Sequence, residues 1–166
     1  MNELKGIGLN PIELDLRQYF GKAAELKAEL TKYDLMYIRG GSGFVLRRAY
    51  HHSGADKVIK ELLSSDALVY AGYSAGPFML CPSLEGIDGR VDLPDFIPEG
   101  YPDGPTIWQC LSILPYAIAP HYKSDHPETK EIDRTIEYYI ANHIPFIALH
   151  DGEAIVVDAK GQRVVG

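Results

Sequence analysis

The sequence predicts an α/β protein with a mostly parallel sheet and helices on both faces. Short apolar segments, such as "LMYI" at 35–38 and "LVYA" at 68–71, alternate with amphipathic segments such as "GKAAELKAELTKY" at 21–33. A strand buried on both faces is a continuous apolar run, whereas an amphipathic helix repeats its apolar residues about every 3.6 positions. Strands that alternate with helices normally form a parallel sheet covered on both sides.

The expected elements follow one another without a linker or an internal repeat. A Pro-, Gly- and Asp-rich segment at 82–105 has no clear period and is expected to form a long loop, of a kind that is often functional. The other expected elements are strands at 11–16, 34–38, 67–71 and within 111–122; helices at 21–33, 44–53, 55–65 and 127–143; the start of a helix at 77–81; and a strand followed by a hairpin at 144–166.

Length and composition favour a single cytoplasmic domain without a cofactor. The chain has 166 residues and a formal net charge of −7, which argues against nucleic-acid binding because such binding needs a basic face. No apolar run approaches the roughly 20 residues that cross a bilayer, and the first residues lack the pattern of a secretory signal. The two cysteines, Cys81 and Cys110, form neither a disulfide framework nor a metal-ligand pattern. We therefore expect no membrane partner and no metal.

The segment "GYSAG" at 72–76 fits the G-x-S-x-G nucleophile elbow, a sharp turn between a strand and a helix. Such a turn holds its serine, here Ser74, above the end of the sheet. The amide of Ala75 can then form half of an oxyanion hole. Ligands of parallel sheets bind beyond the carboxyl ends of the strands. The glycine turn at 40–41 ends another predicted strand and is expected at the same edge.

A nucleophilic serine needs a base, and His121 is the best placed of the six histidines. It follows the apolar segment "AIAP" and is therefore expected at the same sheet edge as Ser74. A third, acidic group should orient its imidazole. The residues alone leave four candidates open, in the loop after the elbow and in "LHDGEAIVV": Glu85, Asp88, Asp151 and Glu153.

Five segments together resemble the dipeptidase E and cyanophycinase family of serine peptidases. They are "YIRGGSGFVL", "GYSAG", "CPSLEGID", "APHY" and "LHDGEAIVV", and the resemblance extends from about residue 12 to about residue 157. It implies a class I glutamine amidotransferase-like fold, which is flavodoxin-like with three layers. It also implies cleavage of peptide bonds next to aspartyl residues.

The resemblance assigns roles to individual residues. Ser74 matches the nucleophile, His121 the general base, and Gly41 a second oxyanion donor beside Ala75. The third catalytic member matches Asp88 in the dipeptidase branch, which "CPSLEGID" favours; the cyanophycinase branch suggests Glu153 as the alternative. The family usually has asparagine after the two glycines, where this chain has Ser42.

The family normally begins with a strand, a helix and a strand ahead of the segment that matches here. The sequence therefore predicts one domain over 1–166 that lacks these first elements. Such a sheet would expose unpaired strand edges, which a homodimer could cover. The leading hypothesis is a serine peptidase that cleaves short aspartyl peptides through an acyl-enzyme. The alternative is a catalytically impaired relative with a role in binding or assembly.

Overall fold

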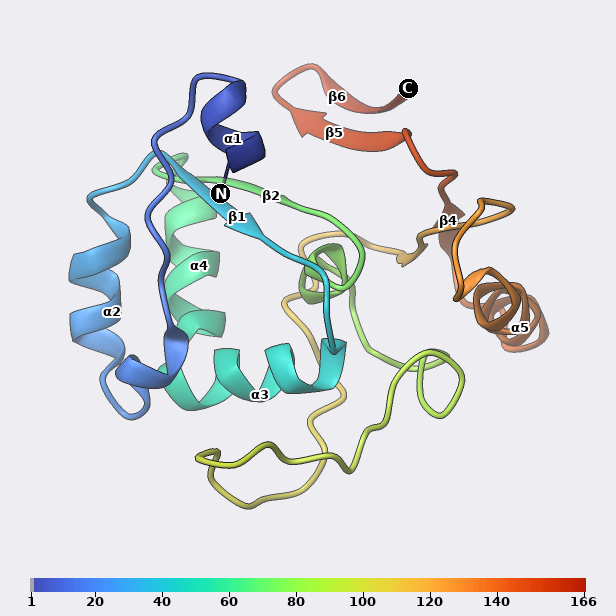
Figure 1. Ribbon diagram of the computed structural model, residues 1–166, viewed down its shortest axis with the longest axis horizontal. Coiled ribbons are helices and arrows are strands. Elements are labelled where there is room, and N and C mark those ends of the chain that lie inside the picture. Colours follow the sequence, from blue (N-terminus) through green and yellow to red (C-terminus); the bar gives the residue numbers. More distant parts are fainter. Residues whose placement is uncertain (1) are drawn as a thin grey trace.

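The computed structural model describes residues 2–166 and shows an α/β fold (Figure 1). This confirms the fold class predicted from the sequence. The elements in chain order are α1 (Asn2–Gly6), the 3-10 helix η1 (Leu16–Tyr19), α2 (Ala23–Leu30), β1 (Leu35–Ile38), α3 (Gly43–Ser53), α4 (Ala55–Ser64), β2 (Val69–Gly72), the 3-10 helix η2 (Gly76–Leu80), β3 (Ala117–Ala119), α5 (Thr129–Ala141), β4 (Phe146–Ala148), β5 (Ala154–Asp158) and β6 (Gly161–Val165).

The strands form three separate pairs. β1 runs parallel to β2, and β3 runs parallel to β4, as the alternation of strands and helices predicts. β5 and β6 form the expected antiparallel hairpin. Within residues 2–166 these pairs are not hydrogen-bonded into one sheet. The 3-10 helix η2 lies between the two parallel pairs, where it contacts β2 of one pair and β3 of the other.

Three helices lie beside the first strand pair, with α2 packed beside α4 and α3 crossing below them (Figure 1). The predicted break between α3 and α4 lies at Gly54, whose φ of 75° is in the left-handed region. A Cβ atom at this position would lie 2.6 Å from the Cβ of Ala23. Gly54 therefore ends one helix and lets α2 approach.

The buried apolar side chains fall into clusters on the two parallel pairs. The largest cluster joins α2, α3, α4, β1 and η2, with Leu26, Tyr50 and Ile59 fully buried. Smaller clusters surround β3 and β4, where α5 contributes Ile132 and Tyr139. None of the helices in residues 2–166 is long and apolar enough to span a membrane.

One local prediction was wrong and another held in part. Residues 11–16 do not form a strand, because the Asp15 carboxylate accepts a hydrogen bond of 3.0 Å from the amide of Arg17 and caps η1 instead. An Asp side chain offers the backbone this local alternative to a ladder. The helix expected to start at 77–81 is present as the short 3-10 helix η2, which ends at Leu80 because Cys81 is extended.

The long loop lacks helices and strands, as expected, but two buried arginines of α3 hold a neighbouring part of the chain in place. The Nε atom of Arg47 donates to the carbonyl of Gln109 at 2.6 Å. The Nη1 atom of Arg48 donates to the carbonyl of Gly104 at 3.1 Å. Hydrogen bonds from buried charged groups are among the stronger ones in proteins. The loop therefore has a defined path beside α3.

Candidate active site

The elbow serine lies in a strained turn that presses against the end of β1. Ser74 has a φ of 54°, a conformation that L-residues other than glycine rarely adopt. Cβ atoms at Gly72 and Gly76 would lie 2.9 and 2.8 Å from the carbonyl oxygen of Ile38. The two motif glycines are therefore required by the close packing of the elbow on β1.

The glycine turn after β1 completes the other side of the elbow. A Cβ at Gly40 would lie 2.8 Å from the Cβ and 3.2 Å from the Oγ of Ser74. Gly41 follows with a φ of 146°, which favours glycine. Ser42 then caps α3, because its Oγ accepts a hydrogen bond of 3.1 Å from the amide of Val45. In this chain Ser42 thus has a structural role.

A tyrosine pair, of which Tyr50 is buried and Tyr70 partly buried, supports the elbow from beneath. The hydroxyl of Tyr70 donates to the carbonyl of Gly76 at 2.8 Å and lies 3.2 Å from the hydroxyl of Tyr50. Burial raises the pKa of both phenols well above the usual value of 10.0. Both therefore stay neutral, and the hydrogen bond to the elbow persists across the physiological range.

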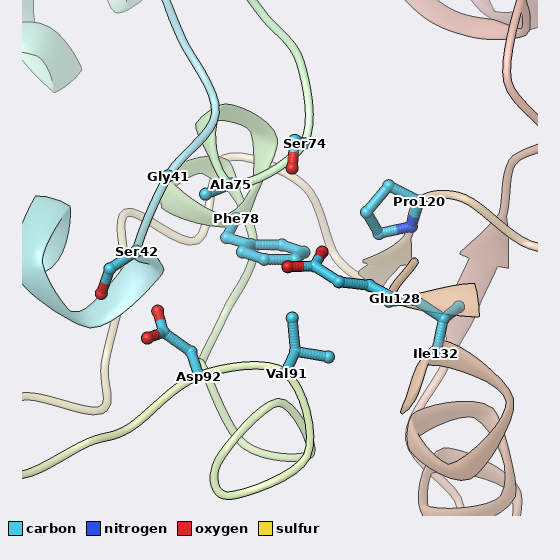
Figure 2. A pocket seen from close by; sticks show the side chains of 10 residues that line it. All are labelled: Gly41, Ser42, Ser74, Ala75, Phe78, Val91, Asp92, Pro120, Glu128 and Ile132. Carbon is cyan, nitrogen blue, oxygen red and sulfur yellow. The ribbon is translucent and has the colours of Figure 1, made fainter. Parts of the chain in front are cut away.

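Ser74 opens onto a cavity of about 170 Å³ between the two parallel strand pairs. Gly41 and Ala75 line the same cavity, and so does Pro120, which follows β3. Figure 2 shows the Ser74 hydroxyl pointing into this space, with Pro120 to one side. The structure therefore brings the elbow, both predicted oxyanion donors and the segment before His121 to one place.

The cavity is acidic, a property that sequence reasoning missed. The carboxylates of Asp92 and Glu128 both reach it, and none of its lining residues is basic (Figure 2). Asp92 comes from the long loop and accepts a hydrogen bond of 3.3 Å from the amide of Phe44. Glu128 immediately precedes α5. No sequence motif marks either residue, because their meeting depends on the path of two loops.

His121 is oriented by a carboxylate and leaves one ring nitrogen free. It lies just after β3 with a φ of 59°. Its Nδ1 atom is 2.7 Å from Oδ1 of Asp151. An ionised carboxylate can only accept a hydrogen bond, so Nδ1 carries the proton and Nε2 offers its lone pair. That Nε2 atom is buried and has no hydrogen-bond partner within residues 2–166, the Ser74 hydroxyl included.

Asp88, the third member favoured from the sequence, does not contact His121 in the structure. Its Oδ1 accepts a hydrogen bond of 2.9 Å from the amide of Gly86 and lies 3.7 Å from the guanidinium of Arg90. These contacts stabilise a turn of the long loop. The carboxylate next to the imidazole comes from another part of the chain.

Glu153, the sequence alternative, also lies elsewhere. Its Oε2 accepts a hydrogen bond of 2.8 Å from the amide of His150 and closes the turn after β4. Asp151 in the same turn faces the histidine instead, and its own amide donates to Oγ of Ser124 at 2.8 Å. The structure thus brings His121 to the carboxylate of "HDGE" that the resemblance did not select.

A serine on a strained strand-to-helix turn, with a carboxylate-oriented histidine next to Pro120 of the cavity wall, has the residue types and the turn of a serine hydrolase site. Comparison with known proteins identifies the family of hydrolases. The sequence profile described as peptidase family S51 matches residues 2–165, so the chain belongs to that family.

Individual relatives are similar over most of this chain but are longer. An uncharacterized peptidase of Listeria monocytogenes is 27% identical over 98% of this chain and 73% of its own length. Peptidase E of Streptomyces coelicolor is 29% identical over 83% of this chain, which is 54% of that protein. A Drosophila melanogaster protein assigned as an alpha-aspartyl dipeptidase is 25% identical over 82% of this chain, which is 55% of that protein.

A solved structure confirms the fold. The crystal structure of a candidate peptidase E protein from Listeria monocytogenes EGD-e superposes with a TM-score of 0.81 at 24% sequence identity. The match covers 99% of this chain and 74% of that one.

Proposed function

We propose that this chain is a serine peptidase of short peptides, in which Ser74 is the nucleophile, His121 the general base and Asp151 the carboxylate that orients it. One observation carries the proposal. Asp151 holds the imidazole through Nδ1, the buried Nε2 atom has no partner within residues 2–166, and His121 directly follows Pro120, which lines the cavity onto which Ser74 opens. Membership of peptidase family S51 supports the same chemistry.

We assign each step of the reaction to a group of this chain. His121 takes the proton of Ser74 as its oxygen attacks the peptide carbonyl, and Asp151 stabilises the imidazolium that forms. The amides of Gly41 and Ala75 stabilise the oxyanion. Neither amide donates a hydrogen bond within residues 2–166, so both are free for this role. Proton return to the leaving amine gives an acyl-enzyme, which water hydrolyses.

The order of the three residues separates this proposal from an esterase of the α/β-hydrolase type. In that fold the acidic member precedes the histidine along the chain. Here the contact is between His121 and the later Asp151. The two arrangements share an elbow but place the carboxylate on different strand ends.

We propose an aspartyl peptide with a free amino terminus as the substrate. The names of the Streptomyces and Drosophila relatives support the aspartyl preference. The acidic cavity suits the substrate ammonium. A second cavity of about 350 Å³ shares Gly41 with the first and contains Arg39, which has no carboxylate partner within residues 2–166. Arg39 is the cation available for the aspartyl side chain.

Labelling with a fluorophosphonate, which modifies activated serines, tests the nucleophile and base. Wild type should be labelled, and Ser74→Ala and His121→Ala should not. Asp151→Asn should slow labelling by about 100-fold or more, because the imidazole loses its orientation and charge partner. Asp88→Asn and Glu153→Gln are matched carboxylate controls that should label at the wild-type rate. Slow labelling of Asp88→Asn with normal labelling of Asp151→Asn would overturn the assignment.

Substrate preference needs a separate measurement. Hydrolysis of aspartyl and alanyl p-nitroanilides should show an aspartyl preference that Arg39→Ala removes. Arg17→Ala is the control in the same cavity, because Arg17 is already paired with Asp15 at 2.7 Å. An unchanged preference in Arg39→Ala would refute the role of Arg39 and leave the serine chemistry intact.

We also propose a competing function in binding or assembly, which one observation favours. No hydrogen bond joins Ser74 to His121 within residues 2–166, and their strand pairs are not joined into one sheet. The edges of the pairs that remain free could be covered in a homodimer. A folded wild-type protein that resists labelling, and that sediments as a dimer, would establish this alternative over the peptidase.

A further inference from the structure

Three potential metal ligands meet beside the cavity. His121, His126 and Glu128 each offer one nitrogen or oxygen atom, and these atoms lie within 4.8 Å of one another. The rings of His121 and His126 are stacked, with centroids 3.7 Å apart and planes 7° apart. All three side chains are half-buried, so the cluster is sheltered and still open to an ion from solution.

The hydrogen bonds around the cluster favour metal binding. The Nε2 atom of His121 is buried without a partner within the described residues 2–166. On the other side of the ring, Nδ1 is held at 2.7 Å by Asp151. Histidines that bind metals almost always donate their second nitrogen to a carboxylate or carbonyl in this way, which fixes the ring and raises its basicity.

We propose that His121, His126 and Glu128 form a zinc-binding site. Two imidazole nitrogens and one carboxylate oxygen suit Zn²⁺, which takes four tetrahedral ligands and leaves the fourth position to water when the protein supplies three. Glu128 also lines the cavity onto which Ser74 opens, so the proposed site adjoins that cavity.

Binding requires the two rings to unstack, because a bound ion lies in the plane of each imidazole and two parallel planes 3.7 Å apart cannot share one ion. Ligand atoms about 2.0–2.1 Å from a tetrahedral zinc are roughly 3.3 Å apart, so the three side chains must close toward one another. The Nδ1 atom of His126 now accepts a hydrogen bond of 3.2 Å from the amide of Glu128. Coordination through Nε2 moves the ring proton to Nδ1, and this long hydrogen bond is given up.

The consequence rests on the proposed function. Zinc would occupy the Nε2 lone pair of His121, which is the lone pair that takes the proton of Ser74. The metal would therefore be a reversible inhibitor rather than a cofactor. Zinc would also compete with the substrate for Glu128, and a chelator would restore activity.

The first test measures metal binding itself. Calorimetric titration with Zn²⁺, and visible absorption with Co²⁺ as a tetrahedral probe, need no catalytic activity. His126→Asn is the informative variant, because asparagine can still accept from the amide of Glu128 but has no distal nitrogen. His143→Asn is the control, since His143 is exposed with a φ of 55°, which asparagine tolerates.

We expect one zinc per chain in wild type and His143→Asn, and affinity lower by more than about tenfold in His126→Asn. The Co²⁺ spectrum of the first two should show the intense visible bands of tetrahedral coordination. Absence of saturable binding by wild type would overturn the proposal. Equal affinity of His126→Asn and wild type would do the same.

The second test measures inhibition through fluorophosphonate labelling of Ser74. Stoichiometric zinc should suppress labelling of wild type and His143→Asn. His126→Asn should be labelled at the same rate with zinc as without it. Undiminished labelling of zinc-loaded wild type would overturn the inhibitory role. A wild type that is never labelled would refute the proposed peptidase function, and the Co²⁺ titration would still decide the metal site.

Discussion

Ser74→Gly should make the protein more stable than Ser74→Ala, although both substitutions remove the nucleophile. The φ of 54° at Ser74 is in the left-handed region, where a Cβ costs about 1–2 kcal/mol. Ser74→Ala keeps that Cβ, whereas Ser74→Gly removes it. Glycine has more conformational freedom in the unfolded chain, which offsets about 0.5–1 kcal/mol of the gain. The expected net difference is about 0.5–1 kcal/mol.

Thermal and urea unfolding of the two variants under identical conditions measures this difference. For a chain of this size, about 0.5–1 kcal/mol corresponds to a Tm higher by about 1–4 °C in Ser74→Gly. The control is Ala75→Gly in the neighbouring position, where φ is −68°. It should lose about 1 kcal/mol, because no strain is relieved there. A Ser74→Gly variant no more stable than Ser74→Ala would show that the elbow is unstrained.

Three further predictions concern the surroundings of the elbow. Gly40→Ala should slow fluorophosphonate labelling of Ser74 by about 100-fold, because the new Cβ would lie 2.8 Å from the Cβ of Ser74 and displace the serine. In the control Gly104→Ala the new Cβ has open space around it, so Ser74 should be labelled at the wild-type rate. Tyr70→Phe should lower the free energy of unfolding by about 1–3 kcal/mol in urea titrations, because a carbonyl of the elbow loses its donor. Burial raises the pKa of Cys81 from 9.0 to about 12. The thiol therefore ionises at lower pH in the unfolded chain, and the free energy of unfolding should fall as pH rises from about 9 toward 12. In Cys81→Ala the free energy of unfolding, measured across this range, should fall less steeply than in wild type, by about 1.4 kcal/mol per pH unit.

Each of these predictions has an outcome that contradicts it. Normal labelling of Gly40→Ala would mean that the turn after β1 moves away from Ser74 freely. A Tyr70→Phe variant as stable as wild type would mean that water replaces the lost donor. Equal alkaline slopes for Cys81→Ala and wild type would mean that the buried thiol is not held in its protonated form.

Much of the helical structure could be predicted because its signals are local. The break at Gly54 follows from the sequence, since only glycine adopts a φ of 75° easily while letting Ala23 approach. The strand predicted at 11–16 was wrong for an equally local reason. Its alternation spans only six residues, and the capping hydrogen bond of Asp15 decided the conformation. That residues 1–166 form one domain lacking the family's first elements stays a prediction.

The site was less predictable because its contacts cross loops. Ser74 carries a motif, and the end of a predicted strand placed His121 near it. The third group depends on tertiary structure, since Asp151 reaches the imidazole across 30 positions of chain. Neighbouring carboxylates in the same turn have the same local character and can be told apart only by the directions of their side chains.

The two halves of the candidate site belong to different strand pairs. Ser74 is set against β1 by glycines that admit no side chain, so its position follows the pair β1–β2. His121 follows the pair β3–β4, because the amide of Tyr122 donates to the carbonyl of Leu149 at 2.9 Å and Asp151 lies just beyond. The distance between nucleophile and base is therefore set by the packing between these pairs rather than by a hydrogen-bonded ladder. Hydrogen bonds of catalytic groups often tighten only when substrate binds. A peptide in the cavity would contact both halves at once, and we infer that its binding brings Ser74 to the Nε2 atom of His121.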